Sequence, residues 1–191
     1  MTLGIISEDK NDCDALEAII NKVYASATII KACGSGKDSI IHQKKVLASK
    51  VHNFNCEAVI ILRDSDGGNT VEIIRRIEDA YSATVIKKIY YICLAVEEIE
   101  AWLMGDLNSV RHVYGLASNS PSLKNSRVDE LHDPKEILKN YILTHSKGKA
   151  QYIPSDITRM ARVINIDKVL SKSPSFKHFH ETLLKCYAAY S

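Results

Sequence analysis

The sequence lacks several features that mark specialised classes of protein. Its 191 residues hold no apolar run near the roughly 20 residues that span a bilayer, and the N-terminus lacks the basic and apolar regions of a signal peptide. The formal net charge is only +2, so no overall basic field indicates nucleic acid, and any such contact needs a local patch. These absences predict a cytoplasmic protein without membrane contact.

The cysteines also lack pattern. The five of them form no Cys-x-x-Cys pair and stand at no metal-ligand spacing with histidine. Most lie beside apolar residues, as small buried side chains do, so we expect no structural disulfide. The absence of Cys and His pairs at ligand spacing argues against a zinc site. With 46% hydrophobic and 25% charged residues, the chain has the balance of a globular protein with a real core.

Short apolar runs alternate with helical patterns over the first hundred residues. β-branched runs predict strands at 4–7, 27–32, 58–62 and 89–96, and apolar stripes predict helices at 9–24, 37–52, 70–81 and 97–104. This alternation predicts an α/β fold with a right-handed, mostly parallel sheet and helices on both faces. The side chains that we expect to face inward from the second and third helices are Ile40, Ile41, Val46, Leu47, Val71, Ile74 and Ile77.

The pattern changes beyond Asp106. Residues 118–133 are rich in Ser, Asn and Pro and indicate a loop. Helices are predicted from Pro134 to about 144, at 155–163 and from Pro174 onward, the last with an inner face of Phe176, Phe179, Leu183, Leu184 and Tyr187. We therefore divide the chain into an α/β domain at 1–110 and a helical C-terminal extension at 111–191 packed on it.

Acidic residues follow three of the predicted strands. They are Glu8 after the first, Asp64 and Asp66 after the third, and Glu97, Glu98 and Glu100 after the fourth. A single acid at a strand end often only caps the next helix. Parallel strands, however, end at one edge of a sheet, where ligands bind. Carboxylates gathered there raise one another's pKa and favour a hard cation such as Mg²⁺ or Mn²⁺.

The spacing of these acids adds detail. Asp64 and Asp66 are two residues apart in an extended segment, so their side chains lie on the same side. Glu8 and Asp12 are four apart, so both can face one point if a helix begins directly after the strand.

These residues also carry a family resemblance. Glu8-x-x-x-Asp12, Asp64-x-Asp66 with its trailing glycines, and Glu98-x-Glu100-Ala-Trp-Leu resemble the motifs of Toprim domains. These are Mg²⁺-dependent folds of topoisomerases, primases and the overcoming-lysogenization-defect nucleases. The whole chain is more closely similar to a small stand-alone prokaryotic Toprim-like family of unassigned function, on residues 96–103 and Ser173-Pro174-Ser175-Phe176.

The resemblance implies a Mg²⁺- or Mn²⁺-dependent phosphoryl-transfer enzyme, a nuclease that hydrolyses phosphodiester bonds in DNA or RNA. It also implies a role in prokaryotic defence beside an ATPase partner, and it leaves a homodimer open. The implied metal ligands are Glu8, Asp12, Asp64, Asp66, Glu98 and Glu100. The implied catalytic residues are Glu8, Asp64, Asp66 and a late lysine, for which we nominate Lys149, or Lys147. One departure is Asp9, where a Toprim start has glycine.

Two other functions fit parts of the sequence. Asp64-Ser65-Asp66-Gly67 resembles the nucleophile motif of haloacid-dehalogenase-type phosphatases, although that family carries it on its first strand and follows it with Thr or Val. A Toprim-like module that binds metal or nucleotide and regulates a partner protein is the non-enzyme alternative.

Basic residues give weaker signals. The loop Gly34-Ser35-Gly36-Lys37 fits a phosphate cradle or a plain turn with an exposed lysine, but not a P-loop. Further candidate phosphate contacts, which fit solvated helix faces equally well, are Lys44, Lys45, Arg75, Arg76, Lys87, Lys88 and the segment 146–149.

Overall fold

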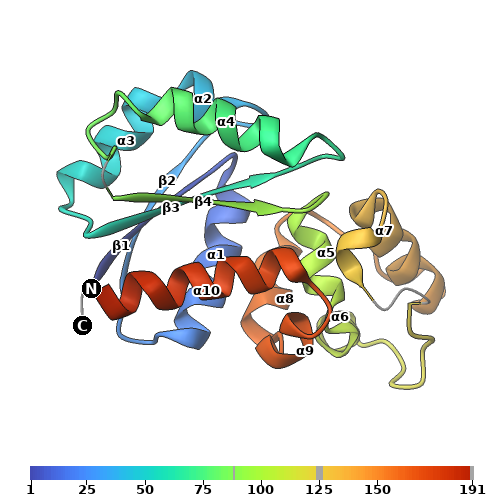
Figure 1. Ribbon diagram of the computed structural model, residues 1–191. Coiled ribbons are helices and arrows are strands. Elements are labelled where there is room, and N and C mark those ends of the chain that lie inside the picture. Colours follow the sequence, from blue (N-terminus) through green and yellow to red (C-terminus); the bar gives the residue numbers. More distant parts are fainter. Residues whose placement is uncertain (88, 124–126, 190–191) are drawn as a thin grey trace.

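The fold is built on one parallel sheet. The computed structural model describes residues 1–87, 89–123 and 127–189 (Figure 1). Its strands are β1 (Thr2–Ser7), β2 (Thr28–Cys33), β3 (Ala58–Asp64) and β4 (Tyr90–Ala95), in the order β2-β1-β3-β4. Every neighbouring pair is parallel. The expected α/β class, with a parallel sheet flanked by helices and a helical C-terminal part, is confirmed.

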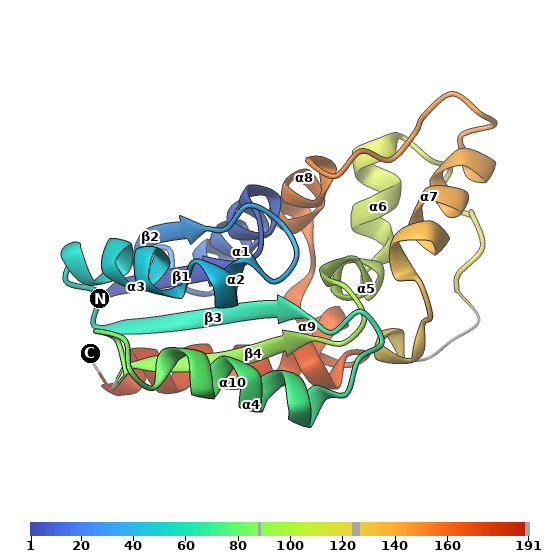
Figure 2. The same cartoon turned by 90° about the horizontal axis from the view of Figure 1, so that it is seen from above.

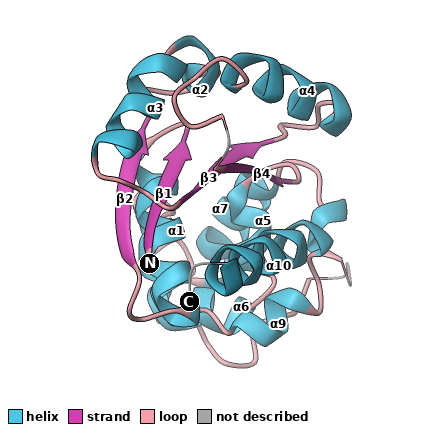
Figure 3. Ribbon diagram, turned by 60° about the vertical axis from the view of Figure 1, so that its left-hand side comes forward, coloured by secondary structure: helices cyan, strands magenta, loops and turns pink. Residues whose placement is uncertain are grey.

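Helices cover both faces of the sheet (Figures 1 and 3). One face carries α2 (Ser39–His42), α3 (Lys44–Asn53) and α4 (Thr70–Tyr81), and the other carries α1 (Lys10–Val23) and α10 (Pro174–Ala189). Beyond the strand ends lie α5 (Ile99–Met104), α6 (Leu107–Tyr114), the 3₁₀ turn η1 (Val128–Glu130), α7 (Pro134–His145), α8 (Asp156–Val163) and α9 (Ile166–Leu170). No helix in the described ranges combines the length and the apolar character needed to cross a bilayer.

Most side chains of the central strands β1 and β3 are apolar because both faces of these strands are buried. In β3, Ile60 belongs to the core on the α1 side, whereas Val59 and Ile61 belong to the core on the α2–α4 side. Gly4 in β1 allows close packing, since a Cβ there would lie 3.1 Å from Val51 of α3. Because neighbouring residues of β3 point to opposite faces of the sheet, each face presents its own set of apolar side chains to the helices that cover it.

The C-terminal helices share the core on the α1 side with the sheet. Trp102 of α5 is fully buried, with its ring centroid 5.2 Å from that of Phe176 and 5.3 Å from that of Phe179. Its indole N–H donates a hydrogen bond of 2.7 Å to Ser175 Oγ. These contacts anchor α10 against α5, the helix that follows the last strand.

Several details differ from the expectations. The helix predicted at 37–52 is two helices, α2 and α3, which meet at Gln43. Val46 is 69% exposed and Val71 is 75% exposed, so these two do not face inward. Leu184 is also 41% exposed on α10. An apolar stripe in the sequence of a helix is often compatible with two neighbouring faces of that helix. Packing against the sheet decides which of the two faces is buried.

Two helices, α6 and α9, lie where no helix was predicted. Both are short and surrounded by loops, so their periodicity is weak.

Candidate functional site

The acidic residues gather at the carboxyl edge of the sheet. β1 and β3 are the central strands of the sheet. The chain places β2 on one side of β1 and β3 on the other, so the strand order reverses between β1 and β3. Such switch points are where α/β sheets bind ligands. In Figure 2 the arrowheads of β3 and β4 point toward the side where α5, α6, α7 and α8 gather.

A pocket of about 250 Å³ opens at this edge. Seven carboxylates and two lysines are among its lining residues, which are Glu8, Asp9, Asn11, Asp12, Gly36, Lys37, Asp64, Asp66, Glu98, Glu100, Lys135, Pro154 and Ile157. All six of the predicted metal ligands therefore line one pocket. We call this set of residues the acidic pocket.

Asp64 lines the acidic pocket from the end of β3. Its Oδ1 accepts a hydrogen bond of 3.1 Å from the backbone N–H of Ile99, in the first turn of α5. Burial raises the pKa of Asp64 well above its ordinary value, and the nearby charges of Asp12 and Glu100 raise it further. The sheet and α5 thus hold a carboxyl group where its ionised form is poorly stabilised.

Glu8, which follows β1, is held from the α2 side. Its Oε1 accepts a hydrogen bond of 2.9 Å from the backbone N–H of Asp38 and lies 3.5 Å from Nε of Arg63. Burial raises the pKa of Glu8, although the Asp38 hydrogen bond and Arg63 both act to lower it. Arg63 is itself only 5% exposed, and its Nη2 lies 2.7 Å from Asp38 Oδ1.

Gly34 makes this arrangement possible. A Cβ at Gly34 would lie 1.9 Å from Ser39 Oγ and 2.9 Å from the carbonyl oxygen of Glu8, far inside contact distance. The same carbonyl accepts hydrogen bonds from Gly36 N at 2.8 Å and from Ser39 Oγ at 3.0 Å. The loop after β2 is therefore hydrogen-bonded to the backbone of Glu8.

Asp12 reaches the pocket from the first turn of α1. Asp9 caps this helix, accepting a hydrogen bond of 3.0 Å from Asp12 N. Burial, followed by the charges of Asp9 and Glu100, raises the pKa of Asp12 to about 7. The residue that departs from the Toprim pattern thus has a structural task here, as an N-cap.

Glu98 and Glu100 share a cation. Lys135 Nζ lies 3.7 Å from Glu98 Oε1 and 3.4 Å from Glu100 Oε1. Glu100 is 3% exposed and also accepts a hydrogen bond of 2.6 Å from the hydroxyl of Tyr152. Burial raises the pKa of Glu98, a rise that the backbone hydrogen bond from Lys135 opposes.

Asp66 sits at the mouth of the pocket. Its backbone is left-handed, with φ of 47°, and its Oδ2 lies 3.0 Å from Lys37 Nζ. Lys37 is the exposed lysine of the loop 34–37, and a hydrogen bond to Asp66, followed by the charge of Asp66, raises its pKa. This loop therefore places an exposed lysine among the residues that line the pocket.

The lysine that we nominated lies elsewhere. Lys149 is exposed just beyond the end of α7 and does not line the pocket, nor does Lys147. The lysine among the acids is Lys135, in the first turn of α7. A spacing rule could not reveal it, because the tertiary packing of α5 and α7 brings it to the site.

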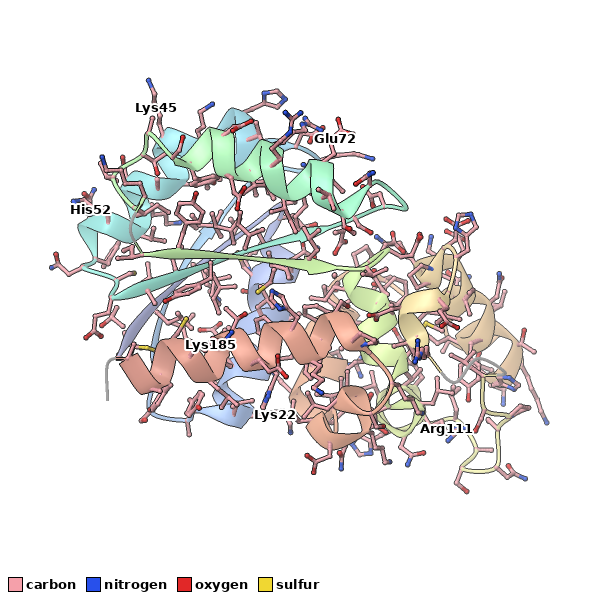
Figure 4. All side chains as sticks on the ribbon, in the orientation of Figure 1. Lys22, Lys45, His52, Glu72, Arg111 and Lys185 are labelled. Atoms are coloured by element: carbon pink, nitrogen blue, oxygen red, sulfur yellow. The ribbon has the colours of Figure 1, made fainter. Side chains whose placement is uncertain are left out.

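The other candidate phosphate contacts lie outside the pocket as well. They include Lys45, which projects outward from α3 (Figure 4), and Arg76, whose Nη2 lies 3.6 Å from Asp38 Oδ1. Lys88 falls outside the described residues.

The sequence reading also missed Arg63, Asp38 and Tyr152. Arg63 did leave a signal, since it directly follows the apolar run 58–62, and a charge so close to a buried strand needs partners.

The donor set suits a hard divalent cation, because it consists of carboxylate oxygens and carries more negative than positive charge. Within the described ranges, no three Asp, Glu, His or Cys side chains are grouped closely enough to hold a metal ion as they stand. The carboxylates surround a pocket rather than a point, so an ion would have to draw some of them inward.

No curated protein and no solved structure gives a significant match. Residues 8–184, which include every acid of the pocket, match the family model described as Domain of unknown function (DUF4276). The chain belongs to this family.

Proposed function

We propose that this protein is a divalent-metal-dependent phosphoryl-transfer enzyme that hydrolyses phosphodiester bonds in DNA or RNA. The observation that carries the proposal is the convergence of Glu8, Asp64 and Glu98 from the ends of three adjacent strands on one pocket. The likeness of these residues to Toprim motifs supports the same reaction class.

The raised pKa values support a cation at this site. Burial and mutual repulsion raise the pKa of Asp12, Asp64, Glu8 and Glu98 together. Groups of this kind are stabilised in their ionised forms by a bound positive charge. Glu8, Asp12, Asp64, Asp66, Glu98 and Glu100 would hold Mg²⁺ or Mn²⁺, which when bound lowers the pKa of water and stabilises charge on the leaving oxygen.

The chain's own residues have distinct tasks in this proposal. Glu8, oriented by Asp38 and Arg63, takes the proton of the attacking water. Lys135, already next to Glu98 and Glu100, offsets negative charge that builds on the phosphate. Lys37 at the rim can meet a phosphate as it enters.

The test is cleavage of plasmid DNA, single-stranded DNA and RNA in Mg²⁺, in Mn²⁺ and in chelator. We expect cleavage with metal only, and a loss of at least about a hundredfold in Asp64→Asn, since removing one such electrostatic group costs roughly that much. Glu72→Gln is the matched control, because Glu72 lies exposed on α4, outside the pocket (Figure 4). Equal activity in Asp64→Asn and wild type would reject the assignment.

A second function has one observation in its favour. The acids are not grouped around a single point, and Lys135 already neutralises two of them. A module that binds metal or nucleotide and regulates a protein partner, without catalysis, fits this arrangement. Binding of Mn²⁺ or Mg²⁺–nucleotide in calorimetry, with no cleavage of any polynucleotide, would support it over the nuclease.

Other parts of the functional picture rest on the resemblance alone. An ATPase partner and a role in prokaryotic defence are proposals of this kind. The phosphatase alternative predicts an acyl phosphate on Asp64, which a phosphomonoester assay with chemical trapping would detect. Asp64 ends the third strand of this fold, not the first.

A further inference from the structure

Two cysteines near the end of β1 lie side by side. Ser7 of β1 and Cys33 of β2 are partners in the strand register, so their side chains point to the same face of the sheet. On that face α1 brings Cys13 over Ser7, with 3.0 Å between Cys13 Sγ and Ser7 Oγ. Ser7 thus lies next to both cysteines, and Cys33 packs against the core cluster that contains Cys13. Both thiols are reduced.

The two thiols are not equivalent. Cys13 is fully buried, whereas Cys33 is partly exposed. The neighbouring thiol of Cys13 acts to lower the pKa of Cys33 to about 7, although burial opposes this. Lys50 and Lys31 act in the same direction as Cys13, and Asp14 acts against them. An accessible sulfur beside a buried one is the arrangement of an attacking and a resolving cysteine.

The remaining cysteines offer no such arrangement. Cys56, Cys93 and Cys186 are buried, and burial raises the pKa of each, to about 11, 12 and 11. Their thiols are therefore poor nucleophiles at neutral pH.

We propose that Cys13 and Cys33 form a hydroperoxide-reactive pair that closes into an intramolecular disulfide. The Cys33 thiolate attacks one oxygen of the hydroperoxide, the O–O bond breaks, and the leaving oxygen takes up a proton as water or alcohol. Cys33 is then a sulfenic acid. The Cys13 sulfur, losing its proton, attacks the Cys33 sulfur, and the S–O bond breaks with release of water. Two thiols are oxidised and one peroxide bond is reduced.

The link would tie the first turns of α1 to the end of β2. Cys13 follows Asp12 of the acidic pocket, and Cys33 precedes Gly34, whose loop is bonded to Glu8. A disulfide needs its sulfurs about 2 Å apart, closer than any non-bonded contact. Its formation would therefore pull α1 toward β2 and alter the contact of Cys13 with Ser7.

Peptide mapping tests the pair directly. The folded protein is treated with hydrogen peroxide, remaining thiols are alkylated under denaturing conditions, and the chain is cut with trypsin without reductant. Cleavage after Lys10, Lys22, Lys31 and Lys37 places Cys13 in peptide 11–22 and Cys33 in peptide 32–37, each with no other cysteine. We expect a linked pair of these peptides that lacks two hydrogen atoms and separates on reduction.

Variants separate this pair from general oxidation. Cys33→Ser should give no link and no sulfenic acid at position 13. Cys13→Ser, which keeps a donor group beside Cys33 but cannot form the disulfide, should leave a Cys33 sulfenic acid that dimedone traps. Cys56→Ser is the control and should form the link as wild type does. If peptides 11–22 and 32–37 of the wild-type protein stay unlinked while Cys33 is oxidised to sulfinic acid, the proposal is overturned. This result depends on neither metal nor cleavage, so it is independent of the proposed nuclease function.

Discussion

Lys135 and Glu98 are joined twice. The backbone N–H of Lys135 donates a hydrogen bond of 2.9 Å to Glu98 Oε2, and its ammonium lies 3.7 Å from Oε1 of the same carboxylate. Because Lys135 is in the first turn of α7, the positive end of that helix also faces Glu98. One residue thus brings two kinds of positive charge to the acidic pocket.

Replacing this lysine should harm the site far more than replacing the nominated one. In Lys135→Ala, Glu98 and Glu100 lose their shared cation, so we expect the free energy of unfolding to fall by about 1–2 kcal/mol and cleavage to slow at least tenfold. Lys149→Ala is the matched control, since Lys149 is exposed and outside the pocket. Chemical denaturation and initial cleavage rates measure both effects. Equal losses in the two variants would contradict the role of Lys135.

The free energy of unfolding should fall as pH rises when no metal is present. The folded-state pKa values of Glu8, Asp12, Asp64 and Glu98 lie above their unfolded values. Folding therefore takes up protons, and stability is lost between about pH 4 and pH 7 as these groups ionise. For Asp12, whose pKa rises from 3.8 to about 7, the loss is at most about 4 kcal/mol.

Denaturation across this pH range, in chelator and in Mg²⁺, measures the effect. Asp12→Asn should flatten the slope in chelator. Magnesium should raise the melting temperature more at pH 8 than at pH 5, because only ionised carboxylates bind it. A stability that increases with pH in chelator would contradict the raised pKa values.

The hydroxyl of Tyr152 should matter for the site as well as for stability. In Tyr152→Phe the buried carboxylate of Glu100 loses a hydrogen bond of 2.6 Å, which we expect to cost about 1–3 kcal/mol. Tyr114→Phe is the matched control, since its hydroxyl bonds to the buried Asp156, also away from solvent but outside the pocket. Both variants should lose stability, and only Tyr152→Phe should change the affinity for Mn²⁺ in calorimetry.

Gly34 should tolerate no side chain. Gly34→Ala places a methyl group against Ser39 and the carbonyl oxygen of Glu8, so we expect a loss of about 1–3 kcal/mol from overpacking. Combining it with Ser39→Gly should restore only part of the loss, because the contact of 2.9 Å with Glu8 is to backbone. Thermal unfolding of the single and double variants measures the loss of stability and how much of it is recovered. Full recovery in the double variant would show that Glu8 is not displaced.

Glu8 and Asp64 could be predicted as site residues from the sequence because they stand at the ends of apolar runs. A run such as Ala58–Leu62 marks a buried strand, and the residue after it lies at the carboxyl edge in any parallel sheet. Asp9 begins the segment 9–24 that was predicted as a helix, and it caps α1. Local pattern and global fold agree at these positions.

Positions that depend on packing between distant segments could not be predicted in this way. Lys135 reaches Glu98 only because α7 packs against α5. The contact of Cys13 with Cys33 needs both the β1–β2 register and the placement of α1. Val46 and Val71 were assigned to inner faces on periodicity alone, whereas the actual faces of α3 and α4 are set by the sheet beneath them.

The shared core described for Trp102 has a consequence for dissecting the protein. Ending the chain near residue 110 would strip α10 from Trp102 and Lys135 from Glu98 in one cut. The fragment would expose a large apolar surface and the carboxylates of the acidic pocket at the same time. Such a fragment would aggregate or bind cations from the buffer nonspecifically. Any ion found on it would therefore say little about metal binding by the whole protein.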